Sequence, residues 1–514
     1  MSETNSNKPH GLASILKRSS RDENIRVISD VLSEYTPIEI ISEIARTEWD
    51  NPTRIIEIFA NSELLPVSTK EVNAAAIYFH TLGIGGGERV TKIIAKTWKK
   101  MGMNSRILVD VMPADVKQKQ NDVPCLEIAD YQSITAENYR QRAESIAAAV
   151  KNNEIDCLVF AHWIARTLPF DLLLARLLGI RVYLYIQSSF TLFFLDADMP
   201  SDYIDIPLSY RLADGIICLS EMDKRFWSSF NRNVIRTNNP ITISPKSGLP
   251  PLNGHNIIWP ARMHSDKSPD RVIPIMRELV KTVPDAKLYM VGPVDASYKE
   301  YFLELASRNN VKENIVICGP QSENEMIAWY EECDAFLLTS RREGWSLALA
   351  EAQASGLPCL IYDLPYLTLS QSDGVISVPQ DDYISAAKEL GSILTDKQRA
   401  QDLGRRGQAF IRKLDNTDPT LFWRKLFSQT SSAHGSDNFE IQYMMASELM
   451  SSYRIHHQGE EHTRLINHNT ISSLEEERNH LLQRIEMIEN SKSFRIGRSL
   501  TFLPRKIMGI IKKR

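Results

Sequence analysis

The sequence lacks the features that would assign it to a secreted, membrane-spanning or nucleic-acid-binding class. None of its six cysteines shows CxxC spacing, and five lie in apolar runs such as "DCLVF", which is typical of buried thiols in a reducing compartment. The start "MSETNSNKPHGLASILKRSS" has no apolar h-region, so we expect no signal peptide. The most apolar run, "DLLLARLLGIRVYLYIQ", includes Asp171, Arg176 and Arg181, so we expect no transmembrane helix.

Neither sign of charge is in large excess, since the formal net charge is -4 over 514 residues. This balance gives no reason to expect nucleic acid as a partner, and any basic surface must be local. A hydrophobic content of 43 % and a charged content of 24 % are typical of a globular protein. We therefore expect large buried cores and a cytoplasmic location.

Short apolar strands alternate with amphipathic helices in two separate regions, which predicts an α/β fold with two doubly wound, Rossmann-like domains facing a cleft. The first series runs from "AAAIYF" to "GIICLS", and the second from "IIWPAR" to "CLIYD". Between them, the breaker-rich "PITISPKSGLPPLNGHN" is typical of a linker. We divide the chain into a polar N-terminus and helical preface (1–71), a first domain (72–241), a linker (242–256), a second domain (257–430), an irregular linker (431–470), and a short coiled coil with a basic amphipathic tail (471–514).

The ends of the chain carry their own signals. "TPIE" at Thr36 is a capping box with proline at the first helical position, which predicts a helix in the preface. Apolar residues at Leu474, Leu481, Ile485 and Ile488 form a heptad-like seam, so we expect a homo- or hetero-oligomer contact through 471–490. The last 25 residues contain eight basic and no acidic side chains among apolar ones, a composition that suits an anionic membrane surface, or packing on a partner.

Three features lie at predicted strand ends. Gly85, Gly86 and Gly87 form a glycine-rich turn into a helix, where backbone amides approach a phosphate, although a tight turn without a ligand has the same composition. The second feature is a loop that contains Arg262 and Lys267 and ends at "SPDR", where we expect Ser268 to be the N-cap of a helix. The two cations could hold a diphosphate. The alternative is an exposed basic loop without a ligand.

The third feature is "TSRREGWSLALAE", which contains two glutamates. Glu343 should occupy a loop between a buried strand and a helix, and Glu351 should lie about a turn and a half into that helix. Taken alone, Glu351 fits a solvated side chain favoured by the helix macrodipole. His162 in "FAHW" follows an apolar strand, a position more often held by a packed structural histidine.

These motifs together resemble the retaining GT-B glycosyltransferases of family four, the glycosyl transferases group 1, over about residues 75 to 425. The resemblance rests on "GGGERV", "FAHW", "GIICLSEMDKRF", "PARMHSDKSPDR", "KLYMVGP", "NIVICGP" and "EGWSLALAEAQASGLPCLIYD", in this order. It implies that the first domain binds an acceptor and that the second binds a nucleotide sugar. The variant with "YD" resembles relatives that build bacterial surface glycans, teichoic-type polymers or protein-linked sugars.

The resemblance also implies roles for single residues. Glu343, His162, Arg262 and Lys267 would be catalytic, with the two cations on the diphosphate and the other two near the donor sugar. The substrate-binding residues would be Gly85, Gly86, Gly87, Gly344, Trp345, Ser346, Leu347 and Glu351, with Glu351 on the ribose hydroxyls. No cofactor and no metal would be needed, because cations and helix N-termini stabilise the departing diphosphate.

Two departures qualify this prediction. Asp196 and Asp198 form a DxD, the pattern with which glycosyltransferases of another fold hold a divalent cation. "LPYLTLSQSDGVISV" replaces the glycine-rich turn and glutamate of many relatives, which leaves donor selection open.

We therefore expect a retaining, metal-independent glycosyltransferase, peripheral on the inner face of the plasma membrane, that moves a sugar from a nucleotide sugar to a glycan or lipid-linked acceptor. The alternative is a catalytically silent GT-B scaffold, or a partner subunit of another glycosyltransferase.

Overall fold

The computed structural model describes residues 32–490, except 52–54, 56–58, 60–64, 66–70, 84, 113–121, 197–198, 416–417 and 429–437. It divides into two compact units, Met1–Glu448 and Leu449–Arg514. Residues 1–31, at the start of the predicted N-terminal segment (1–71), and residues 491–514, in the predicted basic tail, lie outside the described residues. Within the described part of the chain, no helix combines the length and apolar character needed to cross a bilayer.

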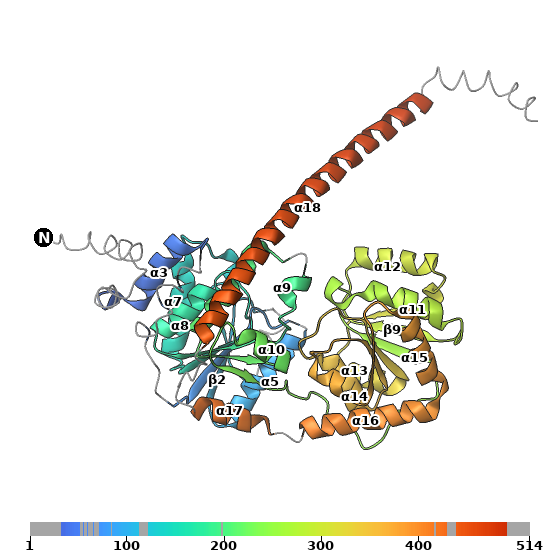
Figure 1. The fold of residues 1–514 in the computed structure, drawn as a ribbon, viewed down its shortest axis with the longest axis horizontal. Helices are drawn as coiled ribbons and strands as arrows, with labels where there is room; N and C mark the ends of the chain where they lie inside the picture. Colours follow the sequence, from blue (N-terminus) through green and yellow to red (C-terminus); the bar gives the residue numbers. More distant parts are fainter. Residues whose placement is uncertain are drawn as a thin grey trace, which may run out of the picture. The chain divides into compact units, whose positions relative to one another are not determined.

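The first domain is built on a parallel sheet in the order β3-β2-β1-β4-β5-β6-β7 (Figure 1). The central strands are buried along their whole length, as expected for apolar runs covered on both faces. The strands are β1 (Ala74–Tyr78), β2 (Asn104–Val109), β3 (Cys125–Glu127), β4 (Cys157–Phe160), β5 (Arg181–Tyr185), β6 (Gly215–Cys218) and β7 (Val234–Arg236).

The second domain repeats this plan with the order β10-β9-β8-β11-β12-β13. Its strands are β8 (Asn256–Pro260), β9 (Lys287–Val291), β10 (Ile315–Gly319), β11 (Ala335–Leu338), β12 (Cys359–Tyr362) and β13 (Val375–Val378). In both sheets the strand order reverses beside the first strand, between β1 and β4 and between β8 and β11. Ligands of open parallel sheets bind outside the carboxyl ends of the strands at this switch point.

Helices connect the strands and cover the sheets (Figure 1). Those of the first domain are α5 (Gly86–Lys100), α7 (Tyr139–Asn152), α8 (Leu168–Leu177), α9 (Leu192–Leu195) and α10 (Glu221–Trp227). Those of the second domain are α11 (Val272–Leu279), α12 (Ala296–Arg308), α13 (Glu323–Glu332), α14 (Leu347–Ser355), α15 (Tyr383–Thr395) and α16 (Lys397–Asp415). The predicted pair of doubly wound domains is confirmed.

Two flanking helices pack on the first domain. In the preface, α3 (Pro37–Glu48) begins at the predicted capping box of Thr36 and Glu39, and it contacts α7 and α8. After the second domain, α17 (Pro419–Ser428) returns to α5, where the Trp423 and Trp98 rings lie 5.0 Å apart. The range predicted for the second domain, 257–430, therefore includes a helix that packs on the first.

The irregular linker predicted for 431–470 is wrong from residue 439 onward, because α18 (Phe439–Asn490) is one continuous helix. Its sequence contains no proline and one glycine, Gly459, so nothing interrupts the backbone hydrogen bonding. The prediction rested on the five histidines between residues 434 and 468, which give this stretch an irregular composition. The first turns contact the first domain, where Glu440 pairs with Arg232 and Tyr443 donates to the carbonyl oxygen of Leu208. The predicted oligomer contact through 471–490 stays a prediction.

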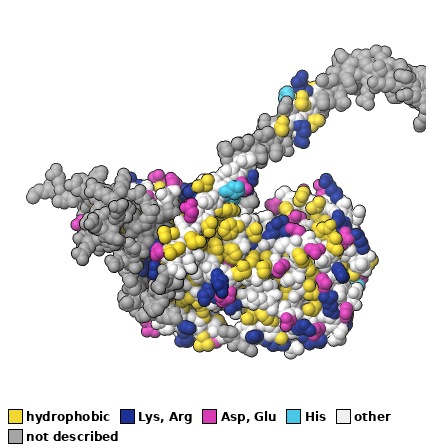
Figure 2. All heavy atoms as spheres, in the orientation of Figure 1, with side chains coloured by type: hydrophobic (Ala, Val, Ile, Leu, Met, Phe, Trp, Pro, Cys, Tyr) yellow, Lys and Arg dark blue, Asp and Glu magenta, His cyan; other side chains and the backbone are white. Residues whose placement is uncertain are grey.

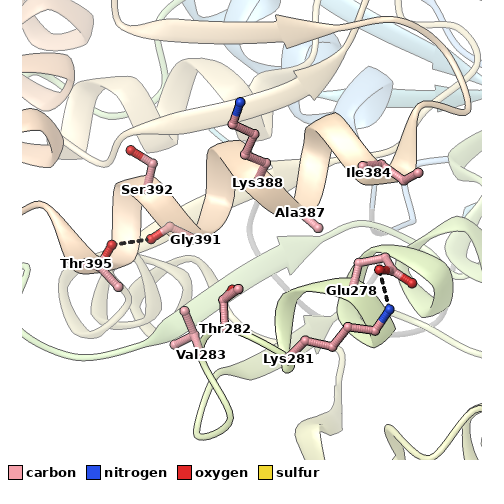
Figure 3. Close-up of a pocket in the computed structure, with 10 residues that line it drawn as sticks. All are labelled: Glu278, Lys281, Thr282, Val283, Ile384, Ala387, Lys388, Gly391, Ser392 and Thr395. Carbon is pink, nitrogen blue, oxygen red and sulfur yellow. Dashed lines mark hydrogen bonds and ion pairs between the residues drawn. The ribbon is translucent and has the colours of Figure 1, made fainter.

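On the face shown in Figure 2, charged side chains of both signs are interspersed among apolar ones. A pocket of about 390 Å³ lies on the second domain between α11 and α15. Figure 3 shows the Glu278–Lys281 ion pair on one wall and the Thr395 hydroxyl bonded to the carbonyl of Gly391 on the other. None of the predicted site residues lines this pocket.

Candidate active site

The loop after β11 brings Glu343 and Lys267 into direct contact. Lys267 Nζ lies 2.7 Å from Glu343 Oε1, and the Ser340 hydroxyl donates to the same oxygen at 2.7 Å. Glu343 is only 9 % exposed. Lys267 comes from the loop after β8, so the pair forms where the two strands at the switch point end. The structure therefore joins two residues that the sequence placed 76 positions apart.

Glu351 lies in the second turn of α14 and is 4 % exposed, so the interpretation as a solvated side chain is wrong. Arg89 Nη1 lies 2.7 Å from its Oε1, and the Thr242 hydroxyl donates to the same oxygen at 2.6 Å. The Tyr330 hydroxyl donates to Oε2 at 3.0 Å. Burial, together with the charge of Glu351, raises the pKa of Tyr330 well above its usual value, so its hydroxyl remains a donor. Three elements thus converge on one buried carboxylate.

The glycine-rich turn faces the start of α14. Gly85 is the N-cap of α5, and a Cβ added at Gly86 would lie 3.5 Å from the Leu347 side chain. A Cβ at Gly344 would overlap the main-chain carbonyl of Gln187, which follows β5. Glycine at position 344 therefore allows the two domains to approach closely, and the N-termini of α5 and α14 both lie in this region.

The turn into α14 has a special backbone geometry. Ser346 is its N-cap with φ of 64°, and its hydroxyl accepts from the amide of Leu349 at 3.4 Å. A left-handed residue other than glycine is uncommon and marks a backbone held by its surroundings. Trp345 beside it is buried at 2 % exposure, so its ring belongs to the core while its amide lies in the loop.

His162 follows β4 at the switch point of the first sheet. Its ring centroid lies 5.6 Å from that of His80 and 5.1 Å from that of Tyr131. Burial, and then the nearby His80, lower the pKa of His162 to about 4, so the imidazole is neutral at neutral pH. Among the described residues, no hydrogen bond or ion pair joins His162 to Lys267 or Glu343.

The basic loop after β8 contains Arg262 and Ser268, and only Ser268 differs from its prediction. Arg262 is exposed and forms no ion pair or side-chain hydrogen bond with another described residue, although its charge helps to lower the pKa of Asp266. Ser268 is not a side-chain N-cap: it has φ of 47° between two short 3-10 helices, and its hydroxyl donates to the carbonyl of Ser265. The α-helical part begins later, at Val272.

Of the two DxD aspartates, only Asp196 lies in the part of the chain that the structure describes. Asp196 Oδ2 lies 3.0 Å from Arg342 Nη2, beside Glu343 in the loop after β11. Asp198 lies outside the described residues. A different set of side chains, His80, Asp110 and Asp130, has ligand-type atoms within 4.8 Å of one another at the strand ends of the first domain.

Sequence reasoning missed Arg89, Thr242 and Tyr330 as partners of Glu351. Arg89 lies two positions after the glycine-rich turn, in the first turn of α5, so the sequence already indicated a positive charge close to that turn. Thr242 and Tyr330 carried no such signal, because a linker threonine and a helical tyrosine are common in any fold.

Comparisons with known proteins place the chain in a fold class. TarM from S. aureus, in a complex with Fondaparinux, alpha-GlcNAc-glycerol and UDP, aligns with a TM-score of 0.58 at 11 % identity over 70 % of this chain and 100 % of that one. Anabaena HepE in complex with UDP and glucose aligns with a TM-score of 0.56 at 13 % identity over 69 % of this chain and 100 % of that one. Sucrose-phosphate synthase from Thermosynechococcus elongatus aligns with a TM-score of 0.59 at 15 % identity over 69 % of this chain and 99 % of that one. The chain has the GT-B fold.

The family comparison covers the second domain. Residues 242–410 match the family model described as "Glycosyl transferases group 1", which confirms the resemblance to that family for this part of the chain. An "Uncharacterized glycosyltransferase" of Haemophilus influenzae is 28 % identical over 158 residues, which is 30 % of this chain and 44 % of the relative. A "D-inositol 3-phosphate glycosyltransferase" of Nocardia farcinica is 28 % identical over 160 residues, which is 30 % of this chain and 36 % of the relative. The matches thus span less than half of these relatives.

Proposed function

We propose that this chain is a retaining glycosyltransferase that moves a sugar from a nucleoside diphosphate to a hydroxyl of a glycan or lipid-linked acceptor in bacterial surface-polysaccharide synthesis. The observation that carries the proposal is the Lys267–Glu343 pair at the switch point of the second sheet. This pair lies inside the segment that matches the group 1 family model.

In the proposed reaction, the bond between the anomeric carbon and the diphosphate oxygen breaks, and the acceptor oxygen bonds to the same face of that carbon. The acceptor's proton passes to the departing diphosphate oxygen, so charge and atoms balance without an enzyme nucleophile. Negative charge then grows on the diphosphate. Lys267, Arg262 and the N-termini of α5 and α14 supply the opposing charge, and preorganised charge of this kind usually lowers the barrier more than any other single effect.

The remaining residues act on the sugar and the nucleoside. Glu343, released from Lys267 by the incoming diphosphate, would face the positive charge that develops at the anomeric carbon. His162, neutral at neutral pH, would hydrogen-bond the donor sugar without adding a charge. Glu351 would accept hydrogen bonds from the ribose hydroxyls in place of Arg89. In this scheme a metal ion is not needed.

A peripheral association with the inner face of the plasma membrane belongs to the same proposal. It rests on the eight basic and nine apolar side chains of residues 490–514, because basic amphipathic segments bind anionic lipid surfaces. A lipid-linked acceptor would then lie at the same surface as the enzyme.

The test begins with a thermal-shift panel of UDP, GDP, ADP, CDP and their common sugars, with and without Mg²⁺, on the full chain. A ligand at about 100 times its Kd stabilises the native state by roughly 2.7 kcal/mol. We expect a shift from one nucleotide without Mg²⁺, and release of that nucleotide from its sugar. A shift that requires Mg²⁺ contradicts the metal-independent scheme, and binding without turnover favours the silent scaffold.

A further inference from the structure

A cluster of hydrogen-bonding and aromatic side chains lies at the strand ends of the first domain, beside His162. His80 follows β1, Asp110 follows β2, and Asp130 and Tyr131 follow β3. The His80 and Tyr131 rings lie 4.8 Å apart in an edge-to-face contact, and both are partly exposed. Since β1 and β4 flank the switch point, this cluster and His162 share the ligand-binding edge of the sheet.

Asp110 fixes the orientation of the His80 ring. The carboxylate is fully buried, and its Oδ2 lies 3.2 Å from His80 Nδ1. It also accepts from the Tyr78 hydroxyl at 2.7 Å and from the Tyr131 amide at 3.3 Å. An ionised carboxylate only accepts hydrogen bonds, so Nδ1 carries the proton in the neutral ring and Nε2 presents a lone pair. The His80 side chain is 21 % exposed, so part of the ring is open to a ligand.

The cluster favours a hydroxyl over a divalent cation. The guanidinium of Arg142 is fully buried and lies 2.9 Å from Asp110 Oδ1. Asp171, at 2.9 Å, and the carbonyl of Ala129 hold Arg142 in place. A cation bound by His80, Asp110 and Asp130 would face this fixed positive charge and lose the proton-bearing Nδ1 as a ligand. A neutral hydroxyl meets neither obstacle.

We propose that His80 and Tyr131 form the acceptor subsite, in which Nε2 of His80 accepts a hydrogen bond from a carbohydrate hydroxyl and the Tyr131 ring packs against the sugar. The inference rests on the proposed function and deepens it. An apolar ring combined with a few oriented polar groups is the usual composition of a small-molecule site. The donor residues Lys267, Glu343 and Glu351 lie on the other domain, so the acceptor must enter from this edge.

The distance to His162 supports this placement. Transfer requires the acceptor oxygen within about 3.5 Å of the anomeric carbon. His162 is the residue of the first domain that we place beside the donor sugar, and its ring centroid is 5.6 Å from that of His80. An acceptor hydroxyl that is hydrogen-bonded to His80 therefore lies within about the width of one sugar ring of the donor sugar beside His162.

The test compares His80→Asn with His255→Asn in the full chain. The asparagine amide at position 80 keeps a donor near Asp110 but removes the acceptor at Nε2. His255 is the matched control, because its Nδ1 also bonds an aspartate, Asp285 at 2.8 Å, on the surface of the other domain. The assay measures the rate of nucleotide release from the sugar donor, first with water as the only acceptor and then with methyl glucoside, methyl galactoside or methyl N-acetylglucosaminide. The readout is the factor by which each glycoside raises this rate.

We expect His80→Asn to lower this acceleration about tenfold or more, because the acceptor hydroxyl loses its hydrogen-bond partner at Nε2, while nucleotide binding and the His255→Asn control stay at wild-type values. An unchanged acceleration in His80→Asn overturns the subsite and leaves the proposed function standing. Wild type that turns over a donor but responds to none of the glycosides overturns the assignment of a carbohydrate hydroxyl. Wild type that releases no nucleotide from any donor removes the proposed function itself.

Discussion

Arg89 of the first domain and Glu351 of the second form an ion pair, with Nη1 2.7 Å from Oε1. The carboxylate is the residue that we propose binds the ribose of the donor, so an arginine of the same chain occupies that position in this structure. Arg89 Nε also lies 3.1 Å from Glu323, which is 73 % exposed at its side chain. In the proposed function, the nucleoside must therefore compete with Arg89 for Glu351.

The substitution Arg89→Met keeps the apolar stem and removes the charge. Because a hydrogen bond to a charged group contributes about 1.5–3 kcal/mol, we expect nucleotide binding to become about tenfold tighter, measured by thermal shift with the nucleotide found in the ligand panel. Glu323→Gln removes the exposed partner of Arg89 and should leave the affinity within a factor of two. Weaker binding by Arg89→Met would show instead that the arginine contacts the nucleotide.

Lys267→Ala should reduce donor turnover by about 100-fold or more, which is the usual loss when one charge-stabilising group is removed from a site. Lys281→Ala is the matched control, since Lys281 also pairs with a glutamate, Glu278, but lies at the pocket between α11 and α15. Rates of nucleotide release decide the outcome. Wild-type turnover in Lys267→Ala would remove this lysine from the mechanism.

Gly344→Ala tests the close approach of the two domains. The added methyl group overlaps the main-chain carbonyl of Gln187, so the backbone of one domain must move relative to the other. Misplacement on this scale costs about 10- to 100-fold in rate. Gly248→Ala in the linker, where nothing lies within 4 Å, should behave as wild type in the same turnover assay. Equal rates in the two variants would contradict the contact.

His162 should make stability depend on pH in the acid range. Its pKa is lowered from 6.5 to about 4, chiefly by burial, so the unfolded chain binds more protons between these values and the native state loses stability as the pH falls through them. The loss is about 3 kcal/mol. Urea unfolding at pH 7 and pH 4 should therefore show that the free energy of unfolding decreases less in His162→Asn than in wild type. An equal loss in both proteins would contradict the lowered pKa.

The basic tail predicts binding to anionic vesicles. The full chain should float with vesicles containing one quarter phosphatidylserine, and a chain ending at residue 490 should not, because each basic side chain near such a surface contributes about 1 kcal/mol. Vesicles of phosphatidylcholine alone are the control. Flotation of both chains to the same extent would assign the binding to another part of the protein.

Local chemistry was enough to locate the elements and the loops that carry the site. The capping box at Thr36, the glycine turn at Gly85 and the loop with Glu343 were predicted correctly, because helix starts, turns and buried strands depend on residues close together in the chain. For 439–470 the prediction of an irregular linker was wrong, because the histidine content was given more weight than the absence of proline from this stretch.

The sequence by itself determined that two parallel sheets form and which residues follow their strands. Only the tertiary structure decided which of these residues meet. The partner of Glu351 is Arg89, 262 positions away, and the partner of His80 is Asp110 from the neighbouring strand. Strand order and the approach of the two domains bring these pairs together, and both depend on packing between distant segments, which local periodicity does not contain.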